Sequence, residues 1–161
     1  QMLPCTNIEA VKESTRNTMN ITRMINRFGD RYKILTGVDP VALESIVLGA
    51  DGWVAGLVDA FPAETVAIFR LVKAGRIDEA LSIYRWFMPL LELDIQPKLV
   101  QYIKLAASLT GIGTEYVRAP RQIISGTERE TVLKTIQDAL AVRPELPDYL
   151  HLKNYADANW S

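Results

Sequence analysis

The chain has 161 residues, of which 48% are apolar, and its 18 basic and 19 acidic residues give a formal net charge of −1. This length is typical of one domain, and the apolar content allows a packed core, which argues against intrinsic disorder. Acidic and basic residues are interleaved without a basic stripe, which argues against nucleic acid as the main partner. The sequence predicts no membrane-spanning helix, because it has no run of about eighteen apolar residues.

The ends of the chain and its single cysteine bear on where the protein works. Cys5 alone cannot form an intrachain disulfide, which fits a reducing compartment, and we expect a cytoplasmic protein. The first residues, QMLPCTN, have neither the basic nor the apolar region of a signal peptide. They also lack an initiator methionine, so we expect the chain to begin inside a longer protein.

The first part of the chain predicts a strand, a helix and a second strand. Residues 7–12 alternate in polarity, as expected for a strand. A helical stripe follows, with Gly29 placed as its stop. Its apolar residues are Ile21, Met24, Ile25 and Phe28. Residues 32–37 predict the second strand.

The alternation continues with two more helices and a third strand. Asp39, followed by Pro40, is predicted to cap the next helix. The buried face expected there is Leu43, Ile46 and Val47. Residues 52–56 predict the third strand, and a helix from Pro62 should end at Gly75. Its predicted stripe is Ala63, Val66, Phe69 and Val72.

Three helices without strands complete the predicted elements. They begin near Asp78, near Pro97 and at Thr127, where Glu130 has the spacing of a capping box. Residues 143–161 are expected to be a tail with little order. We therefore predict barrel-type βα units over residues 1–76, a helical appendix over 77–142 and the tail.

Alternating strands and helices predict an α/β fold with a parallel sheet. A parallel sheet of three strands is a poor free-standing object, because such sheets are normally covered on both faces and closed at their edges. We therefore expect this sheet to join other strands.

Lys12 is the first candidate for chemistry, because it lies at the carboxyl end of the first strand, where βα folds carry their sites. Apolar Ile8 and Ala10 precede it at alternate positions. An amine at the mouth of an apolar cavity loses hydration, which favours the neutral form, and a neutral lysine attacks carbonyl carbons to form a Schiff base. From periodicity alone, a lysine that ends a strand and reaches solvent is the more common outcome.

Three motifs change that balance. VKES at residues 11–14, ILTGVD at 34–39 and GADGWVAG at 49–56 resemble the dihydrodipicolinate synthase / N-acetylneuraminate lyase family. The resemblance implies the C-terminal part of a (β/α)8 TIM barrel, strands six to eight, followed by three additional helices. It extends over residues 7–140.

The resemblance also implies roles for single residues. Lys12 matches the lysine that forms the Schiff base with a 2-oxo acid. Gly37, with Thr36 before it, matches the strand-seven motif, and Val54 matches the strand-eight residue that lines the pocket, so Gly37, Thr36 and Val54 are the predicted substrate-binding residues. No metal or organic cofactor is implied, because the lysine iminium is itself the electron sink.

Within the family, GADGWVAGLVDAFPAET and RIDEALSIYRWFMPLLELD are most similar to 1-pyrroline-4-hydroxy-2-carboxylate deaminases of hydroxyproline degradation. Two alternatives stay open: dihydrodipicolinate synthase, which condenses pyruvate with an aldehyde, and a non-catalytic fragment that serves only assembly. The family's Thr-Thr pair and strand-five tyrosine have no match here. The resemblance therefore implies a companion N-terminal barrel segment, a small-molecule substrate and a homo-oligomer, usually a tetramer.

Other candidate residues carry weaker signals. His151 is the lone histidine and has no cysteine or carboxylate cluster at metal-ligand spacing, so a surface position is expected. Glu13 and Asp39 lie near strand ends and could orient polar groups. We expect no metal site.

Overall fold

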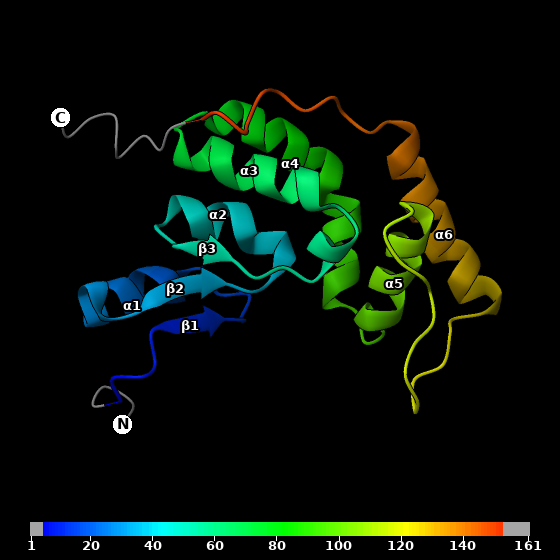
Figure 1. The fold of residues 1–161 in the computed structure, drawn as a ribbon, viewed down its shortest axis with the longest axis horizontal. Helices are drawn as coiled ribbons and strands as arrows, with labels where there is room; N and C mark the ends of the chain where they lie inside the picture. Colours follow the sequence, from blue (N-terminus) through cyan, green and yellow to red (C-terminus); the bar gives the residue numbers. More distant parts are fainter. Residues whose placement is uncertain (1–4, 153–161) are drawn as a thin grey trace.

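The computed structural model describes residues 5–152. The three strands alternate with the helices α1 to α3, and the helices α4 to α6 follow without strands (Figure 1). The strands and longer helices are β1 (Ala10–Glu13), α1 (Met19–Phe28), β2 (Lys33–Thr36), α2 (Ala42–Val47), β3 (Gly52–Trp53), α3 (Pro62–Lys73), α4 (Ile77–Leu91), α5 (Leu99–Leu109) and α6 (Gly126–Ala141). The 3₁₀ helices are η1 (Gly29–Arg31), η2 (Asp39–Val41), η3 (Leu57–Asp59) and η4 (Glu92–Ile95).

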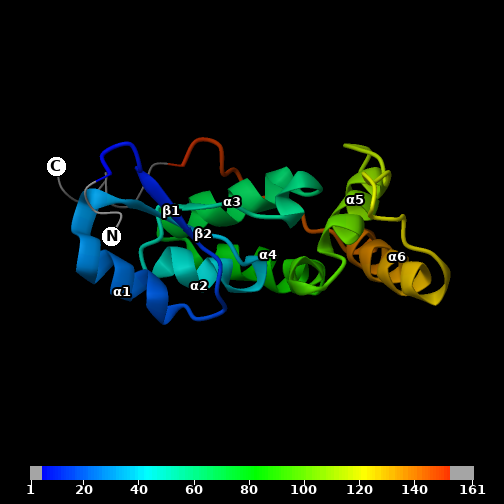
Figure 2. The ribbon, with the colours of Figure 1, turned by 90° about the horizontal axis from the view of Figure 1, so that it is seen from below.

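The three strands form one parallel sheet in the order β1-β2-β3. Lys12 pairs with Leu35, and Thr36 pairs with Trp53. All three strands therefore end at the same edge of the sheet, and Figures 1 and 2 show α5 and α6 beyond that edge. This confirms the predicted α/β fold with a parallel sheet.

The two faces of the sheet differ in burial. Glu13 and Thr36 are buried on the face that packs under the helices. Ala10, Lys12 and Val54 are exposed. Because side chains alternate along a strand, these two sets point to opposite faces. Among residues 5–152, β1 and β3 each pair with β2 alone, so both outer edges of the sheet carry no further strand.

The hydrophobic core lies mainly among the helices. One large cluster runs from α2 through α6 and includes Phe61, Phe87 and Ile136. A smaller cluster around Ile21 and Ile34 joins α1 to the sheet. Helices α4 to α6 thus share one core with the helices that follow β2 and β3.

Several local predictions are confirmed and others are wrong. Helix α1 ends at Gly29, whose φ of 52° suits glycine, as predicted. The stripe predicted for α3 is correct only in part: Val72 is buried and Phe69 packs against the core, but Val66 is exposed. The buried positions also include Glu64 and Ile68. A charged residue at a buried position hides the true apolar pattern. In α2, Val47 is exposed, against expectation.

Both predicted helix caps are also wrong. Asp39 makes no capping bond to the helix that follows it, because its carboxylate is used elsewhere, as described below. Helix α6 begins at Gly126 after Ser125, without a side-chain capping bond, so Thr127 and Glu130 lie too far inside the helix for a capping box.

Residues 143–152 form no helix or strand, but they pack against the core, contrary to the expectation of little order. The guanidinium of Arg143 pairs with the fully buried carboxylate of Glu64 and lies over the Phe61 ring. Arg70 donates a 2.6 Å hydrogen bond to the carbonyl of Leu150. Residues 143–152 are therefore held against α3 at two positions. The rest of the predicted tail, with Trp160, lies outside the described residues.

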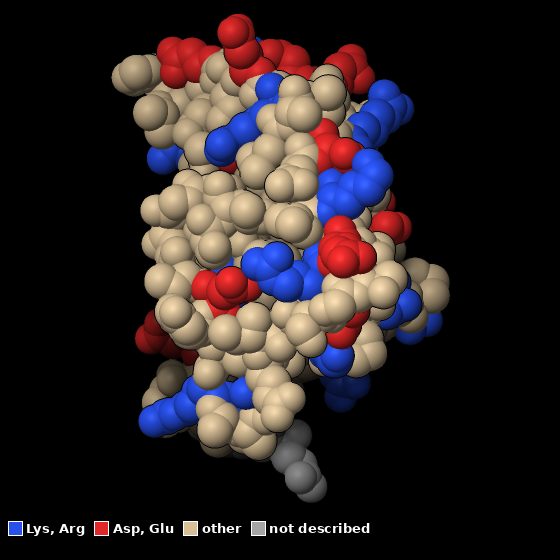
Figure 3. Space-filling model, turned by 90° about the vertical axis from the view of Figure 1, so that its right-hand side faces the viewer, with Lys and Arg blue, Asp and Glu red and all other residues tan. Residues whose placement is uncertain are grey.

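The surface agrees with the charge pattern of the sequence. On the side that faces the viewer in Figure 3, basic and acidic side chains are interspersed. Ion pairs in this region include Lys98, just before α5, with Glu128 of α6, and Lys134 with Asp138 within α6. Within residues 5–152, no helix is long and apolar enough to cross a membrane.

Candidate functional site

Lys12 lies one residue before the end of β1, and a network around Glu13 fixes the turn that follows. Oε1 of Glu13 accepts hydrogen bonds from the Thr15 amide (3.1 Å), the Thr15 hydroxyl (2.6 Å) and the Asn20 side-chain amide (3.3 Å). Because Glu13 points to the buried face, Lys12 points to the opposite one. The charged residue after Lys12 thus anchors the strand end.

An open pocket of about 440 Å³ lies at the carboxyl ends of the strands. It is bounded by residues that follow each of the three strands and by the segment that joins α4 to α5. The lining residues are Lys12, Ser14, Arg16, Gly37, Val38, Ala55, Gly56, Asp94, Ile95 and Leu99. Lys12 therefore lies in a concave site at the carboxyl end of the sheet.

Gly37 lies directly against the Lys12 side chain. A methyl group in place of its hydrogen would collide with Lys12 Cε and would lie 2.8 Å from Cγ. It would also lie 2.5 Å from the Ser14 hydroxyl. The Lys12 side chain thus occupies the space that a side chain at position 37 would need.

The other two residues predicted from the sequence do not line this pocket. Thr36 is buried on the helix-covered face, beside Glu13 in the strand register. Val54 is 42% exposed on the open face of the sheet. The structure therefore brings Lys12 and Gly37 together, whereas Val54 and Thr36 lie outside the lining.

Asp39 forms the buried support behind the pocket. Its Oδ1 accepts hydrogen bonds from Trp53 Nε1 (3.0 Å) and the Gly56 amide (3.3 Å), and its Oδ2 accepts one from the Leu57 amide (2.9 Å). Burial raises the pKa of Asp39 to about 6, against the lowering effect of these bonds. Instead of capping its own helix, Asp39 holds the amides at the start of η3 and ties the loop after β2 to the loop after β3.

Asp94 is the acidic group of the pocket itself. It lies in η4, and a methyl group on Gly56 would collide with its Oδ1. Burial raises the pKa of Asp94, while a hydrogen bond with the Asp39 backbone and the charge of Lys12 lower it. The pocket thus places one carboxyl near two basic side chains, Lys12 and Arg16.

Sequence reasoning missed Asp94 and Arg16. Asp94 lies 82 positions after Lys12, between two helices that we treated as an appendix, so no local motif connects the two residues. Arg16 lies in the turn after β1 and looked like an ordinary solvated residue. The one sequence signal for Asp94 was Gly56, because a glycine after a strand leaves space for another side chain, and Asp94 occupies that space.

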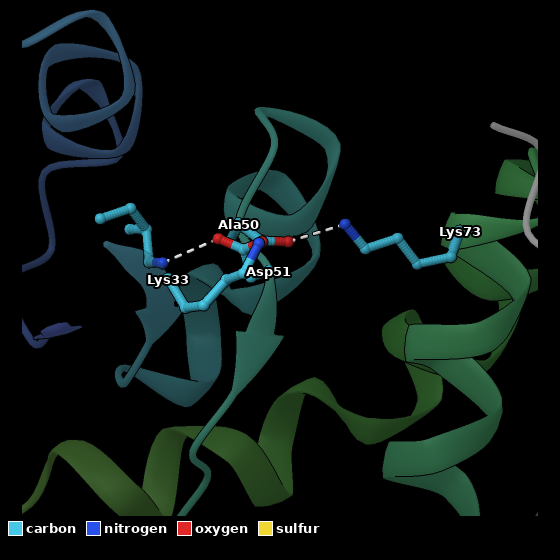
Figure 4. Close-up of polar contacts among 5 residues, drawn as sticks. Lys33, Ala50, Asp51 and Lys73 are labelled. Atoms are coloured by element: carbon cyan, nitrogen blue, oxygen red, sulfur yellow. Dashed lines mark hydrogen bonds and ion pairs between the residues drawn. The ribbon is translucent and has the colours of Figure 1, made fainter. Parts of the chain in front are cut away.

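The opposite end of the sheet carries a second polar cluster (Figure 4). Lys33 Nζ lies 3.2 Å from Asp51 Oδ1, and Lys73 Nζ donates a 2.8 Å hydrogen bond to the Ala50 carbonyl. Burial lowers the pKa of Lys73. The cluster lies where β2 and β3 begin, away from Lys12. No group of histidine, cysteine and acidic residues suited to a metal ion occurs within residues 5–152.

The model of the dihydrodipicolinate synthetase family matches residues 1–139. The chain belongs to that family. The match covers the strands, the pocket and nearly all of α6, so the pocket lies within the part of the chain that defines the family. The hydroxyproline-degrading subgroup is not resolved by this match.

Several relatives are 4-hydroxy-tetrahydrodipicolinate synthases. The enzyme of Chlorobaculum parvum is 29% identical over 126 residues, which are 78% of this chain and 43% of that protein. The enzyme of Prosthecochloris aestuarii is 31% identical over 114 residues, which are 71% of this chain and 38% of that protein. The chain thus spans less than half the length of these dihydrodipicolinate synthetase family members.

Solved structures show the same fold. Dihydrodipicolinate synthase from Aquifex aeolicus matches with a TM-score of 0.76 at 25% identity, over 93% of this chain and 48% of that one. The 4-hydroxy-tetrahydrodipicolinate synthase of Methylacidiphilum fumariolicum SolV matches with a TM-score of 0.73 at 24% identity, over 84% of this chain and 46% of that one. The parallel sheet and its helices are therefore those of the family's barrel structures.

Proposed function

We propose that Lys12 is the Schiff-base lysine of an enzyme in this family, acting on a small 2-oxo acid or cyclic imine. The observation that carries this proposal is the position of Lys12 in a pocket at the carboxyl ends of parallel strands, against Gly37. Sites in βα barrels are built at this end. Gly37 lets the lysine and the substrate approach the backbone closely.

The chemistry follows from the amine. Neutral Lys12 attacks the carbon next to the substrate carboxylate and forms a bond to it. Water leaves that carbon in a 2-oxo acid, and the ring nitrogen leaves it in a cyclic imine. The resulting iminium withdraws electrons, so the adjacent carbon can lose a proton and form an enamine.

In more detail, we propose a deaminase of 1-pyrroline-4-hydroxy-2-carboxylate in hydroxyproline degradation. After the ring opens, the enamine expels the 4-hydroxyl as water, and hydrolysis then releases ammonia and 2,5-dioxopentanoate, with one water consumed overall. Support comes from the likeness of residues 49–65 and 76–94 to such deaminases. Thr36 and Val54 keep their proposed substrate contacts only if the completed barrel rearranges around them.

The second candidate is 4-hydroxy-tetrahydrodipicolinate synthase, which uses the lysine enamine of pyruvate to attack an aldehyde. The names of the relatives in Chlorobaculum parvum and Prosthecochloris aestuarii favour it. A third candidate, from another class, is a non-catalytic fragment whose helices serve assembly.

The catalytic proposal includes a companion barrel segment that carries strands one to five. Two observations support it: Ala10 and Val54 are exposed on the open face of the sheet, and no further strand among residues 5–152 pairs with the outer edges of β1 and β3. That segment would supply the Thr-Thr pair and the strand-five tyrosine. A cytoplasmic tetramer is the assembly proposed for the complete enzyme.

Reductive trapping tests the proposal. The chain, completed by its companion segment, is treated with borohydride and either pyruvate or the hydroxypyrroline, and the adduct is mapped by mass spectrometry. We expect the added mass on the peptide that contains Lys12, and none in Lys12→Arg, because arginine stays protonated. Lys73→Arg is the matched control and should trap normally.

The outcomes separate the candidates. Ammonia release from the hydroxypyrroline supports the deaminase, and condensation of pyruvate with aspartate semialdehyde supports the synthase. Adducts on Lys33 or Lys104 would refute the role of Lys12. No adduct with either substrate would leave the assembly fragment as the better interpretation.

A further inference from the structure

Asp94 is the acidic side chain that lines the Lys12 pocket, and its environment differs from that of buried Asp39. Both oxygens of Asp39 are engaged by Trp53 and by backbone amides. Asp94 is only partly buried and faces the pocket. Its carboxyl is therefore available to a ligand, whereas that of Asp39 is not.

The position of Asp94 is well defined although it lies on a short connecting helix. η4 is continuous with α4, and its residue Leu93 is buried in the large core. Gly56 leaves the space that Asp94 Oδ1 occupies. The absence of a side chain at Gly56 and the burial of Leu93 thus define where the carboxylate lies before any ligand arrives, which lowers the entropy cost of binding.

The charges around the pocket define a complementary ligand. Lys12 and Arg16 supply positive charge, and Asp94 supplies negative charge. A plain 2-oxo acid such as pyruvate offers only a carboxylate and a carbonyl. A substrate that also carries a cationic nitrogen gives Asp94 a partner, and hydrogen bonds between charged groups are about twice as strong as neutral ones.

We propose that Asp94 determines specificity in this pocket by binding a cationic nitrogen that the substrate carries near its carboxylate. This inference rests on the proposed function, because it assumes that Lys12 is the Schiff-base lysine. It names the substrate class: small carboxylic acids with a reactive carbonyl or imine carbon that also bear an amine or iminium nitrogen. Both substrates that could distinguish the two enzyme candidates, the hydroxypyrroline and aspartate semialdehyde, carry such a nitrogen.

A pair of unreactive ligands isolates this contact. Proline and cyclopentanecarboxylate share a five-membered ring and a carboxylate, and they differ in one ring group, NH₂⁺ or CH₂. Each is titrated against the trapping of pyruvate on Lys12 in the completed barrel. The readout is the ratio of the two concentrations that halve the trapping rate.

We expect proline to protect wild-type Lys12 at about a tenfold lower concentration, which corresponds to about 1.4 kcal/mol. In Asp94→Asn the ratio should fall to about one, because the amide keeps the shape and loses the charge. Asp94→Ser, which shortens the side chain, should give the same ratio. Glu92→Gln is the matched control on the same 3₁₀ helix, where Glu92 is exposed, and it should keep the wild-type ratio.

The failures are distinguishable. Equal protection by both ligands in the wild-type protein overturns the role of Asp94, whether or not the variants fold. A tenfold ratio that persists in Asp94→Asn or Asp94→Ser also overturns it. If pyruvate never traps on Lys12 in the wild-type protein, the proposed function fails, and this inference fails with it.

Discussion

The two ends of the same three strands are built in opposite ways. At the carboxyl end, Lys12 lies in an open pocket, and the carboxylate of Asp39 holds backbone amides from behind. At the amino end, the Lys33 amine pairs with the side chain of Asp51, and the Lys73 amine donates a hydrogen bond to the carbonyl of Ala50 (Figure 4).

The difference shows that lysines at the two ends of one sheet have different surroundings. Lys73 gives its amine to a carbonyl and so completes the hydrogen bonding of the loop before β3. Lys12 faces a glycine and a cavity. At the amino end both lysine amines have acceptors, whereas at the carboxyl end the Lys12 amine and the Asp94 carboxyl line the open pocket.

The largest expected effect concerns the pH dependence of stability at the carboxyl end. Because burial raises the pKa of Asp39 from 3.8 to about 6, the folded protein holds a proton there that the unfolded chain has lost. The contribution of Asp39 to the free energy of unfolding is therefore fully present below pH 3.8 and is lost as the pH rises to about 6. The total change is about 3 kcal/mol.

Urea unfolding of the completed barrel between pH 4 and 7 measures this change. The Asp39→Asn side chain cannot titrate. The free energy of unfolding of this variant should therefore change with pH by about 3 kcal/mol less than that of the wild type. Parallel curves for the two proteins would show that Asp39 is not a proton-binding group, and the contrast between the two ends would lose its electrostatic basis.

The second effect concerns Gly37→Ala, which should slow trapping on Lys12 about a hundredfold. The new methyl group would displace Cε of the lysine, and misplacement of a reacting group by about 1 Å costs that much. The free energy of unfolding should change less than trapping does, because the Lys12 side chain lies in an open pocket and can move, although Ser14 must also shift. Gly113→Ala, whose new methyl would lie 3.3 Å from Ala107 Cβ, is the control; equal trapping in both variants would show that the lysine tolerates the crowding.

The third effect tests the amino end. Asp51→Ala removes the acceptor that binds the Ile34 amide at 2.8 Å and should lower the free energy of unfolding by about 1 kcal/mol. Asp51→Asn keeps an acceptor and should cost less. Trapping on Lys12 should stay at the wild-type rate in both variants. A loss of trapping would show that the two ends of the sheet are coupled.

The smallest effect is expected for Lys33→Ala. Its ion pair with Asp51 is exposed, with 65% of the lysine side chain accessible, so its loss should cost less than about 0.5 kcal/mol and should vanish at high salt. Thermal unfolding at low and high salt checks this. A salt-independent loss above about 1 kcal/mol would mean that the pair is structural.

The fold and half of the candidate site could be predicted from the sequence. Lys12 and Gly37 stand in local motifs next to strands, so periodicity and resemblance could place them together. Asp94 could not be found in this way, because it reaches the pocket through the packing of α4 and η4. The prediction that Asp39 caps the helix after it was wrong. A capping rule uses only neighbouring residues, so it cannot show that the side chain accepts a hydrogen bond from the start of η3.

A charged residue inside the core accounts for the error in α3. The stripe of α3 was displaced because Glu64 looks like a surface residue in the sequence, although it is fully buried. Only the spatial position of Arg143, 79 positions later in the chain, makes that burial tolerable.

The pairing of Arg143 with Glu64 also shows that the end of the family match and the end of the packed region are different positions in the chain. The family match ends at residue 139, but the cation that neutralises the carboxylate inside α3 comes from residue 143. A chain cut at the limit of homology would keep every family motif and leave a buried charge without its counter-ion. The residues that pack together therefore extend beyond the part of the chain that the family model matches, and that match alone would place the end of the packed region too early.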